Sequence, residues 1–108
     1  MTRTYDRLVR DRVPDVIRGN GETPVTHAVA GDEYRDRLAA KLVEEAREYE
    51  ADRDPGELGD VLDVVDAICE ARSVDRERLD DQRAEKTAER GGFADGVVLE
   101  RVGEATGE

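Results

Sequence analysis

The sequence is poor in the residues that cross-link a fold or fill a large core. Its 108 residues include no tryptophan, one phenylalanine, three tyrosines and one cysteine. A single cysteine excludes an intrachain disulfide, and so few aromatic residues mean that the core must be built from aliphatic side chains. Cys69 lies in an apolar pattern of helical period, so we interpret it as a buried thiol.

Long hydrophobic runs are also missing. The first thirty residues contain no apolar stretch of the signal-peptide type, and no span approaches the length that crosses a bilayer. We therefore expect a cytoplasmic protein without a membrane partner.

Lysine is scarce, whereas acidic residues are abundant. Only Lys41 and Lys86 are lysine among 17 basic residues, against 28 acidic ones, and the formal net charge is −11. Without a broad basic surface, general nucleic-acid binding is not expected. An acidic, lysine-poor surface suits high salt, where screening removes self-repulsion, so we interpret the protein as halophilic. Disorder is the competing interpretation of so much charge, but the central segments have regular apolar stripes.

Residue spacing predicts an all-α fold in one domain over residues 1–108, a helical bundle with minor hairpin or edge strands at 22–31 and 97–102. Four helices are predicted. The first is short, begins at Pro14 and ends at Gly19 to Gly21, and the second is long and runs from an Asp32 N-cap to about Asp52. The third follows an Asp54 N-cap, with Pro55 at its first position, and ends near Ser73, and the fourth covers 76–90. The fourth is almost entirely polar, which calls for a partner chain or a functional reason.

Two acidic patterns stand on the second and third predicted helices. The first is Glu44-Glu45-x-x-Glu48, and the second is Glu57-x-x-Asp60, which Asp63 and Asp66 continue. Because residues three or four apart share a helix face, Glu45 neighbours Glu48, and Glu57 neighbours Asp60. Antiparallel packing of the two helices would let the two pairs face each other.

A helical projection relates these acids to the apolar faces. The predicted stripe of the second helix is Leu38, Leu42, Ala46 and Tyr49, and that of the third is Leu58, Val61, Leu62, Val65, Ile68 and Cys69. Glu45 falls at the edge of its stripe, whereas Glu44 points furthest from the core.

Four converging carboxylates need a cation, because like charges at close range are strongly disfavoured. Oxygen ligands without cysteine or histidine suit a hard ion, Mg²⁺ or Mn²⁺. Such ions also bind substrate phosphates, which points to phosphate-ester or phosphoanhydride chemistry. The alternative is that each carboxylate is a solvated surface group of an acidic chain.

Glu-Glu-x-x-Glu followed by Glu-x-x-Asp on consecutive helices resembles the MazG-like nucleoside triphosphate pyrophosphohydrolases. This superfamily includes phosphoribosyl-ATP pyrophosphohydrolase and all-α dUTPases. Two flanking stretches resemble one phosphoribosyl-ATP pyrophosphohydrolase-like subgroup: RLVRDRVP at residues 7–14 and KTAERGGF at residues 86–93. The resemblance covers most of the chain.

The resemblance implies a helical bundle whose core and active site are completed in a homodimer or homotetramer. It implies Mg²⁺, or Mn²⁺, held by Glu45, Glu48, Glu57 and Asp60, with Glu44 and Glu45 as catalytic acids. The implied reaction cleaves a nucleotide between its α and β phosphates. Arg10, Arg12, Lys86 and Arg90 are the candidate phosphate ligands. Arg12 departs from the subgroup, which usually has lysine there, and a guanidinium lacks the point-like geometry of an ammonium.

Several alternatives stay open at this point. Arg10 and Arg12 have Asp6 and Asp11 as local ion-pair partners, and Lys86 and Arg90 stand where a helix dipole favours cations. His27, Tyr34 and Phe93 are either packing residues or base-stacking residues. Two other functions compete with the main one: hydrolysis of phosphoribosyl-ATP in histidine biosynthesis, and a non-catalytic helical interaction module.

Overall fold

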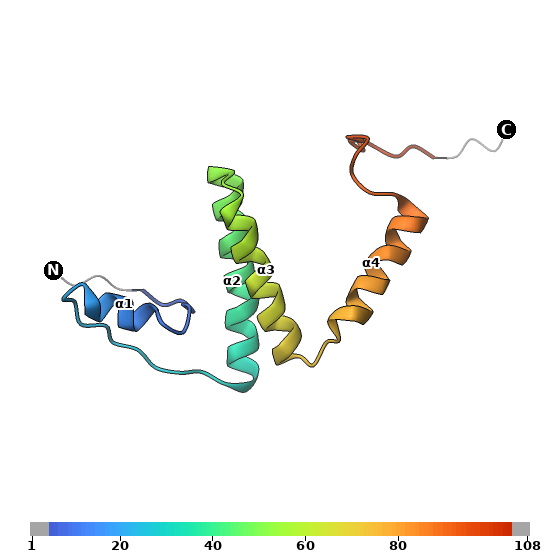
Figure 1. The fold of residues 1–108 in the computed structure, drawn as a ribbon. Helices are drawn as coiled ribbons and strands as arrows, with labels where there is room; N and C mark the ends of the chain where they lie inside the picture. The colour runs from blue at the N-terminus through green and yellow to red at the C-terminus, as the bar shows by residue number, and fades with distance from the viewer. Residues whose placement is uncertain (1–4, 105–108) are drawn as a thin grey trace. The chain divides into compact units, whose positions relative to one another are not determined.

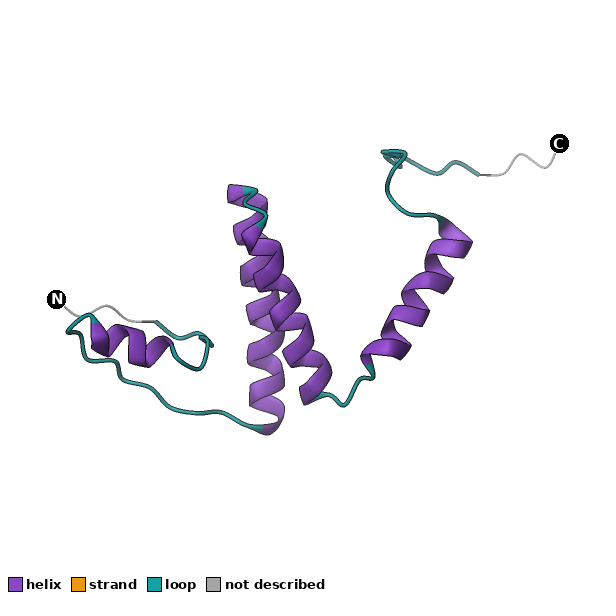
Figure 2. Ribbon diagram, viewed as in Figure 1, coloured by secondary structure: helices purple, strands orange, loops and turns teal. Residues whose placement is uncertain are grey.

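The computed structural model describes residues 5–104 and contains four helices (Figure 1). They are α1 Val13–Gly19, α2 Gly31–Asp52, α3 Gly56–Ala71 and α4 Arg76–Arg90. The described residues contain no strand (Figure 2), so the all-α prediction is confirmed and the minor strands predicted at 22–31 and 97–102 are wrong. A lone extended segment forms no sheet, because a strand needs a neighbour to accept and donate its backbone hydrogen bonds.

A three-residue turn, 53–55, joins α2 to α3. Arg53 adopts a left-handed conformation with φ of 60°, and its backbone N–H donates to the carbonyl of Tyr49 at 2.8 Å, which closes α2. The Asp54 carboxylate then accepts the backbone N–H of Gly56 at 3.0 Å. The N-cap residue of α3 is Pro55, so the predicted Asp54 N-cap is wrong by one residue, although Asp54 still accepts the N–H of the first helical residue.

The start of α2 differs from the prediction. Its N-cap residue is Ala30, which has an extended backbone and makes no side-chain capping bond. Asp32 lies inside the first turn instead, where its carboxylate pairs with Arg35 and meets the positive end of the helix dipole. The predicted Asp32 N-cap is therefore wrong by two residues.

The chain separates into two compact units, one up to residue 76 and one from residue 77 onward. In the first unit, α2 and α3 pack against each other as an antiparallel hairpin (Figure 1). In the second, α4 buries no residue, and the described residues after it are exposed. The second unit therefore has no core of its own, which a separate domain requires. The single-domain prediction stays a prediction.

The hairpin has a small core. Its buried apolar side chains are Leu38, Val64 and Cys69, and they are joined by one buried acid, Glu45. Burial of Cys69 confirms the interpretation of its thiol. Within the described residues, no helix combines the length and the apolar content needed to cross a bilayer.

The packed faces of the hairpin are rotated from the projected ones. On α2, Glu45 is 8% exposed and lies within the buried face rather than at its edge, whereas Ala46 is exposed. On α3, Val64 is buried while Leu58 and Leu62 keep 46% and 53% of their surface exposed. Because α3 is apolar around most of its circumference, α2 covers only one side of it.

Candidate functional site

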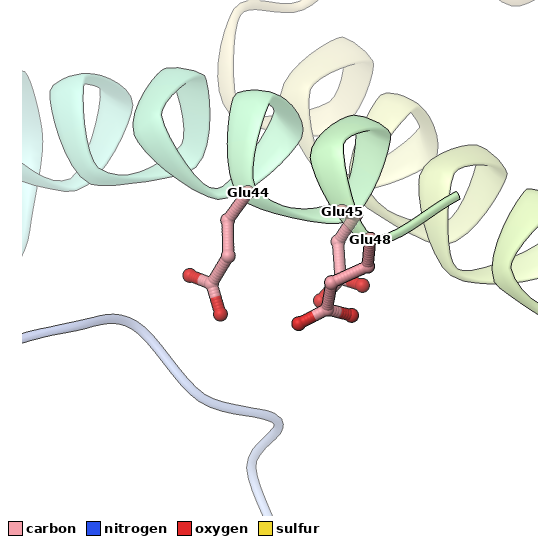
Figure 3. A group of neighbouring side chains, drawn as sticks. All are labelled: Glu44, Glu45 and Glu48. Carbon is pink, nitrogen blue, oxygen red and sulfur yellow. The ribbon is translucent and has the colours of Figure 1, made fainter. Parts of the chain in front are cut away.

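Three carboxylates gather on one side of α2 (Figure 3). One oxygen each from Glu44, Glu45 and Glu48 lies within 4.8 Å of the others. The helix produces this grouping, because Glu48 is four residues after Glu44 and three after Glu45. Glu44, with a side chain 26% exposed, belongs to the group. The prediction that it points furthest from the core is wrong.

The charges in this group are not fully balanced. A side-chain hydrogen bond with Glu45 raises the pKa of Glu48, and the negative charge of Glu45, desolvation and the charge of Glu44 act in the same direction. Glu48 therefore loses its proton less readily than an isolated glutamate. A cation placed at the group would favour the ionised carboxylates.

Lys41 supplies part of the missing positive charge. Its Nζ lies 3.2 Å from Oε1 of Glu44 and 3.2 Å from Oε1 of Glu45, and its side chain is only 13% exposed. A half-buried ammonium against a buried carboxylate shows that this place on α2 favours a cation. Sequence reasoning missed Lys41, although its spacing of three and four residues before the two acids was the available signal.

Glu57 brings the first carboxylate of α3 toward the end of α2. Its Oε2 is buried and has no hydrogen-bond partner among the described residues. Desolvation raises the pKa of Glu57 to about 7, and a hydrogen bond with Asp52 and the charges of Asp52 and Glu48 add to the effect. Asp52 was missed from the sequence, although it continues the row of Glu45 and Glu48 by one further turn.

Asp60, the fourth predicted ligand, is held by an arginine. Nη2 of Arg10 donates to Asp60 at 2.8 Å and to Asp63 at 2.9 Å. The hydrogen bonds to Asp63 and Asp60 raise the pKa of Arg10 further. The alternative pairing of Arg10 with Asp6 is wrong, because Asp6 accepts from Arg37 at 2.9 Å instead. Asp60 thus faces the N-terminal segment and is not part of the α2 group.

A second arginine of that segment reaches α2. Arg7 pairs with Glu44, and its guanidinium carbon lies 5.6 Å from the centroid of the Tyr5 ring. Arg7 was also missed as a site residue. Arg12, by contrast, is exposed and forms no ion pair with the residues that the structure describes, Asp11 included.

The remaining predicted phosphate ligands lie on α4. Lys86 and Arg90 are exposed and stand four residues apart. They belong to the second compact unit, whereas the carboxylates belong to the first. Their place at the site rests on the resemblance. Phe93 and His27 are exposed, so neither packs within the described chain, whereas Tyr34 is half-buried.

The donor set fits a hard divalent ion. The gathered group consists of carboxylates without histidine or cysteine, and Glu57, outside that group, has an orphaned, buried oxygen. The hydrogen bond with Glu45 raises the pKa of Glu48, and desolvation raises the pKa of Glu57, so a nearby cation would favour the ionised form of both carboxyls. Carboxylate oxygens in excess of local counter-charge are what Mg²⁺ and Mn²⁺ bind.

Among known proteins, the chain is similar to an uncharacterised protein of Mycolicibacterium smegmatis. The two are 51% identical over 45 residues, which is 42% of this chain and 46% of that protein. The match therefore spans less than half the length of the relative. No family model and no solved structure matches the chain.

Proposed function

We propose that the protein hydrolyses a nucleoside triphosphate or a related nucleotide between its α and β phosphates. The products are a nucleoside monophosphate and pyrophosphate, and the role is the removal of non-standard nucleotides in the cytoplasm. The observation that supports this proposal is the gathering of Glu44, Glu45 and Glu48 on α2 beside an α3 carboxylate, Glu57, that has a buried, unpartnered oxygen.

The carboxylates have two tasks in this reaction. Glu45, Glu48, Glu57 and Asp60 would hold Mg²⁺ or Mn²⁺, and Lys41 balances charge until the ion is present. A bound ion of this kind neutralises phosphate oxygens and lowers the pKa of water.

Glu44 is more exposed than its neighbour Glu45, which is buried. We assign Glu44 to accept the proton of the attacking water, and Glu45 to fix the geometry of the group. The new bond joins the water oxygen to the α phosphorus, and the anhydride oxygen leaves with pyrophosphate.

Cations of the chain would bind the polyphosphate. Arg10 already stands beside Asp60, and Arg12 follows two residues later with no ion-pair partner among the described residues. Lys86 and Arg90 share one face of α4. Arginine suits this task because its planar donors match two phosphate oxygens at once.

We further propose that the core and site are completed in a homodimer or homotetramer. The described part of the chain buries three apolar side chains, and Leu58 and Leu62 leave one side of α3 uncovered. On α2, Val43 likewise keeps 47% of its surface exposed. A helix that is apolar on more than one side is stable when a neighbour covers the second side.

The direct test is pyrophosphate release from a nucleotide panel in molar salt with Mg²⁺. The panel contains standard triphosphates, damaged or non-standard nucleotides, and phosphoribosyl-ATP as the competing substrate. Glu45→Ala and Asp60→Ala should lose turnover, whereas Glu85→Ala, on exposed α4, should retain it. Wild-type turnover in both site variants would show that the metal assignment is wrong. No hydrolysis of any nucleotide, together with no Mn²⁺ binding, would favour the interaction module.

A further inference from the structure

Arginine contacts tie the N-terminal segment to both acidic helices. Arg37 of α2 donates to the backbone carbonyl of Asp6 at 3.3 Å as well as to its carboxylate. Arg7 then pairs with Glu44 on α2, and Arg10 reaches α3. The segment thus places one guanidinium against each of the two helices that carry the candidate ligands.

The contact on α3 is shared between two carboxylates. The same nitrogen of Arg10, Nη2, donates to Asp60 and to Asp63. Only Asp60 belongs to the second acidic pattern, and Asp63 lies three residues further along the same helix face. All three side chains are largely exposed, so each contact is weak and exchangeable.

The shared contact matters when an ion binds. Arg10 donates to Oδ1 of Asp60, so a divalent ion that binds this carboxylate competes with the guanidinium for its charge. With Asp63 present, the guanidinium keeps one partner next to the site and need not be released into water. It also keeps other N–H donors, because a guanidinium has five of them.

We propose that Asp63 is a positioning residue that holds Arg10 at the rim of the carboxylate site while a divalent ion occupies Asp60. Arg10 then presents its remaining donors to substrate phosphate. The inference rests on the proposed function and deepens it, because it assigns a task to an acid outside both patterns. Asp66 provides the contrast: it is one turn further along α3 and pairs with Arg76, not with the N-terminal segment.

Calorimetric titration of Mn²⁺ without nucleotide tests this assignment, at the lowest salt that keeps the protein folded. Arg10→Ala removes the competitor for Asp60, so Mn²⁺ should bind about twofold to fivefold tighter, the range of exposed ion pairs. Asp63→Asn leaves Arg10 with Asp60 alone, so Mn²⁺ should bind about twofold to fivefold weaker. In the Arg10→Ala background the same Asp63→Asn change should alter affinity less than about twofold, because the two residues act through one contact.

Two controls separate contact from charge and from folding. Asp66→Asn makes the same charge change on α3 and should alter Mn²⁺ affinity less than about twofold. Asp63→Glu keeps the carboxylate and should restore the wild-type value. In steady-state kinetics, Asp63→Asn should raise KM for the nucleotide more than it lowers kcat, since a misplaced phosphate ligand weakens binding first.

The possible results distinguish failure of this inference from failure of the proposed function. Additive effects of Arg10→Ala and Asp63→Asn on Mn²⁺ affinity would overturn this inference while leaving the proposed function intact. An equal loss in Asp66→Asn and Asp63→Asn would do the same. A wild-type protein that binds no Mn²⁺ would overturn the proposed function and this inference together.

Discussion

The α3 helix and the α4 helix are both rich in charge, but they balance it differently. α3 carries five acids and no basic residue, whereas α4 carries five acids and five basic residues. On α4 the charges pair locally, as between Arg83 and Asp80 at 2.8 Å. On α3 the counter-charges come from other segments, with Arg10 on Asp60 and Asp63, and Arg76 on Asp66.

This difference separates an acidic surface from an acidic site. α4 buries none of its residues, so its acids keep their hydration and need no special partner. In the hairpin, Glu45 and one oxygen of Glu57 are buried, and the α2 acids outnumber the local bases. Glu45 has Lys41 as a counter-charge, but Glu57 forms no ion pair with the described residues. A buried acid without counter-charge either takes up a proton or binds a cation, and the proposed ion site follows from that choice.

The largest expected contrast is between two Glu→Gln substitutions, one in the α2–α3 hairpin and one on α4. Glu45→Gln removes a buried carboxylate from the α2 group, and nucleotide turnover should fall about a hundredfold or more, since even supporting residues of metal sites are worth 10–100-fold. Glu85→Gln on α4 should leave turnover unchanged. The assay is pyrophosphate release at saturating Mg²⁺, and equal turnover in the two variants would remove the distinction between surface and site.

The second contrast concerns stability. Leu38→Ala opens a cavity in the small core of the hairpin and should lower the free energy of unfolding by about 2–4 kcal/mol. Leu99→Ala, in the exposed segment after α4, should change it by less than about 0.5 kcal/mol. Urea unfolding at one fixed protein concentration measures both values. A comparable loss in Leu99→Ala would mean that the second unit is packed in the assembly.

The third prediction concerns pH. The pKa of Glu57 is raised to about 7 from its ordinary value of 4.5, so the folded chain holds a proton that the unfolded chain has released between these values. Without an ion, this group therefore makes the free energy of unfolding fall as pH rises from about 4.5 to about 7. Above pH 7 it causes no further change.

An ion must displace the Glu57 proton, so Mn²⁺ affinity should rise about tenfold between pH 6 and pH 8. Calorimetry in buffers of different ionisation enthalpy counts the released proton. Glu57→Gln should flatten the profile, whereas Glu77→Gln on α4 should not. A wild-type profile without a step in this range would exclude Glu57 as the titrating ligand.

The smallest effect is expected on α4. Arg83→Gln breaks an exposed pair of residues three apart, and such pairs are worth about 0.3–0.5 kcal/mol on a helix. Thermal unfolding should therefore change little, and less still in molar salt. A loss above about 1 kcal/mol would show that α4 charges are engaged in a buried contact.

The sequence predicted those features that depend on neighbours along the chain. Pro14 lies in the first turn of α1, as predicted, Asp54 precedes α3 by two residues, and α4 has the predicted range of residues 76–90. The spacing of Glu45 and Glu48 likewise predicted their shared side of α2.

Features that depend on the rotation and contacts of packed segments were not predictable in this way. The burial of Glu45 and Val64, and the exposure of Leu62, follow from which sides of α2 and α3 meet. A projection of α3 cannot choose that side, because apolar residues surround most of the helix. The contact of Arg10 with Asp63 joins residues far apart in sequence, so no local period contains it.

The central claim is that the carboxylates of the α2–α3 hairpin bind a divalent ion, Mg²⁺ or Mn²⁺, and that the acids of α4 do not. Titration of Mn²⁺, followed by the electron paramagnetic resonance signal of the free ion in molar salt, tests it most directly. We predict saturable binding in the wild type, its loss in Glu48→Gln and its retention in Glu89→Gln on α4. Absence of saturable binding in the wild type, or equal binding in both variants, would contradict the account.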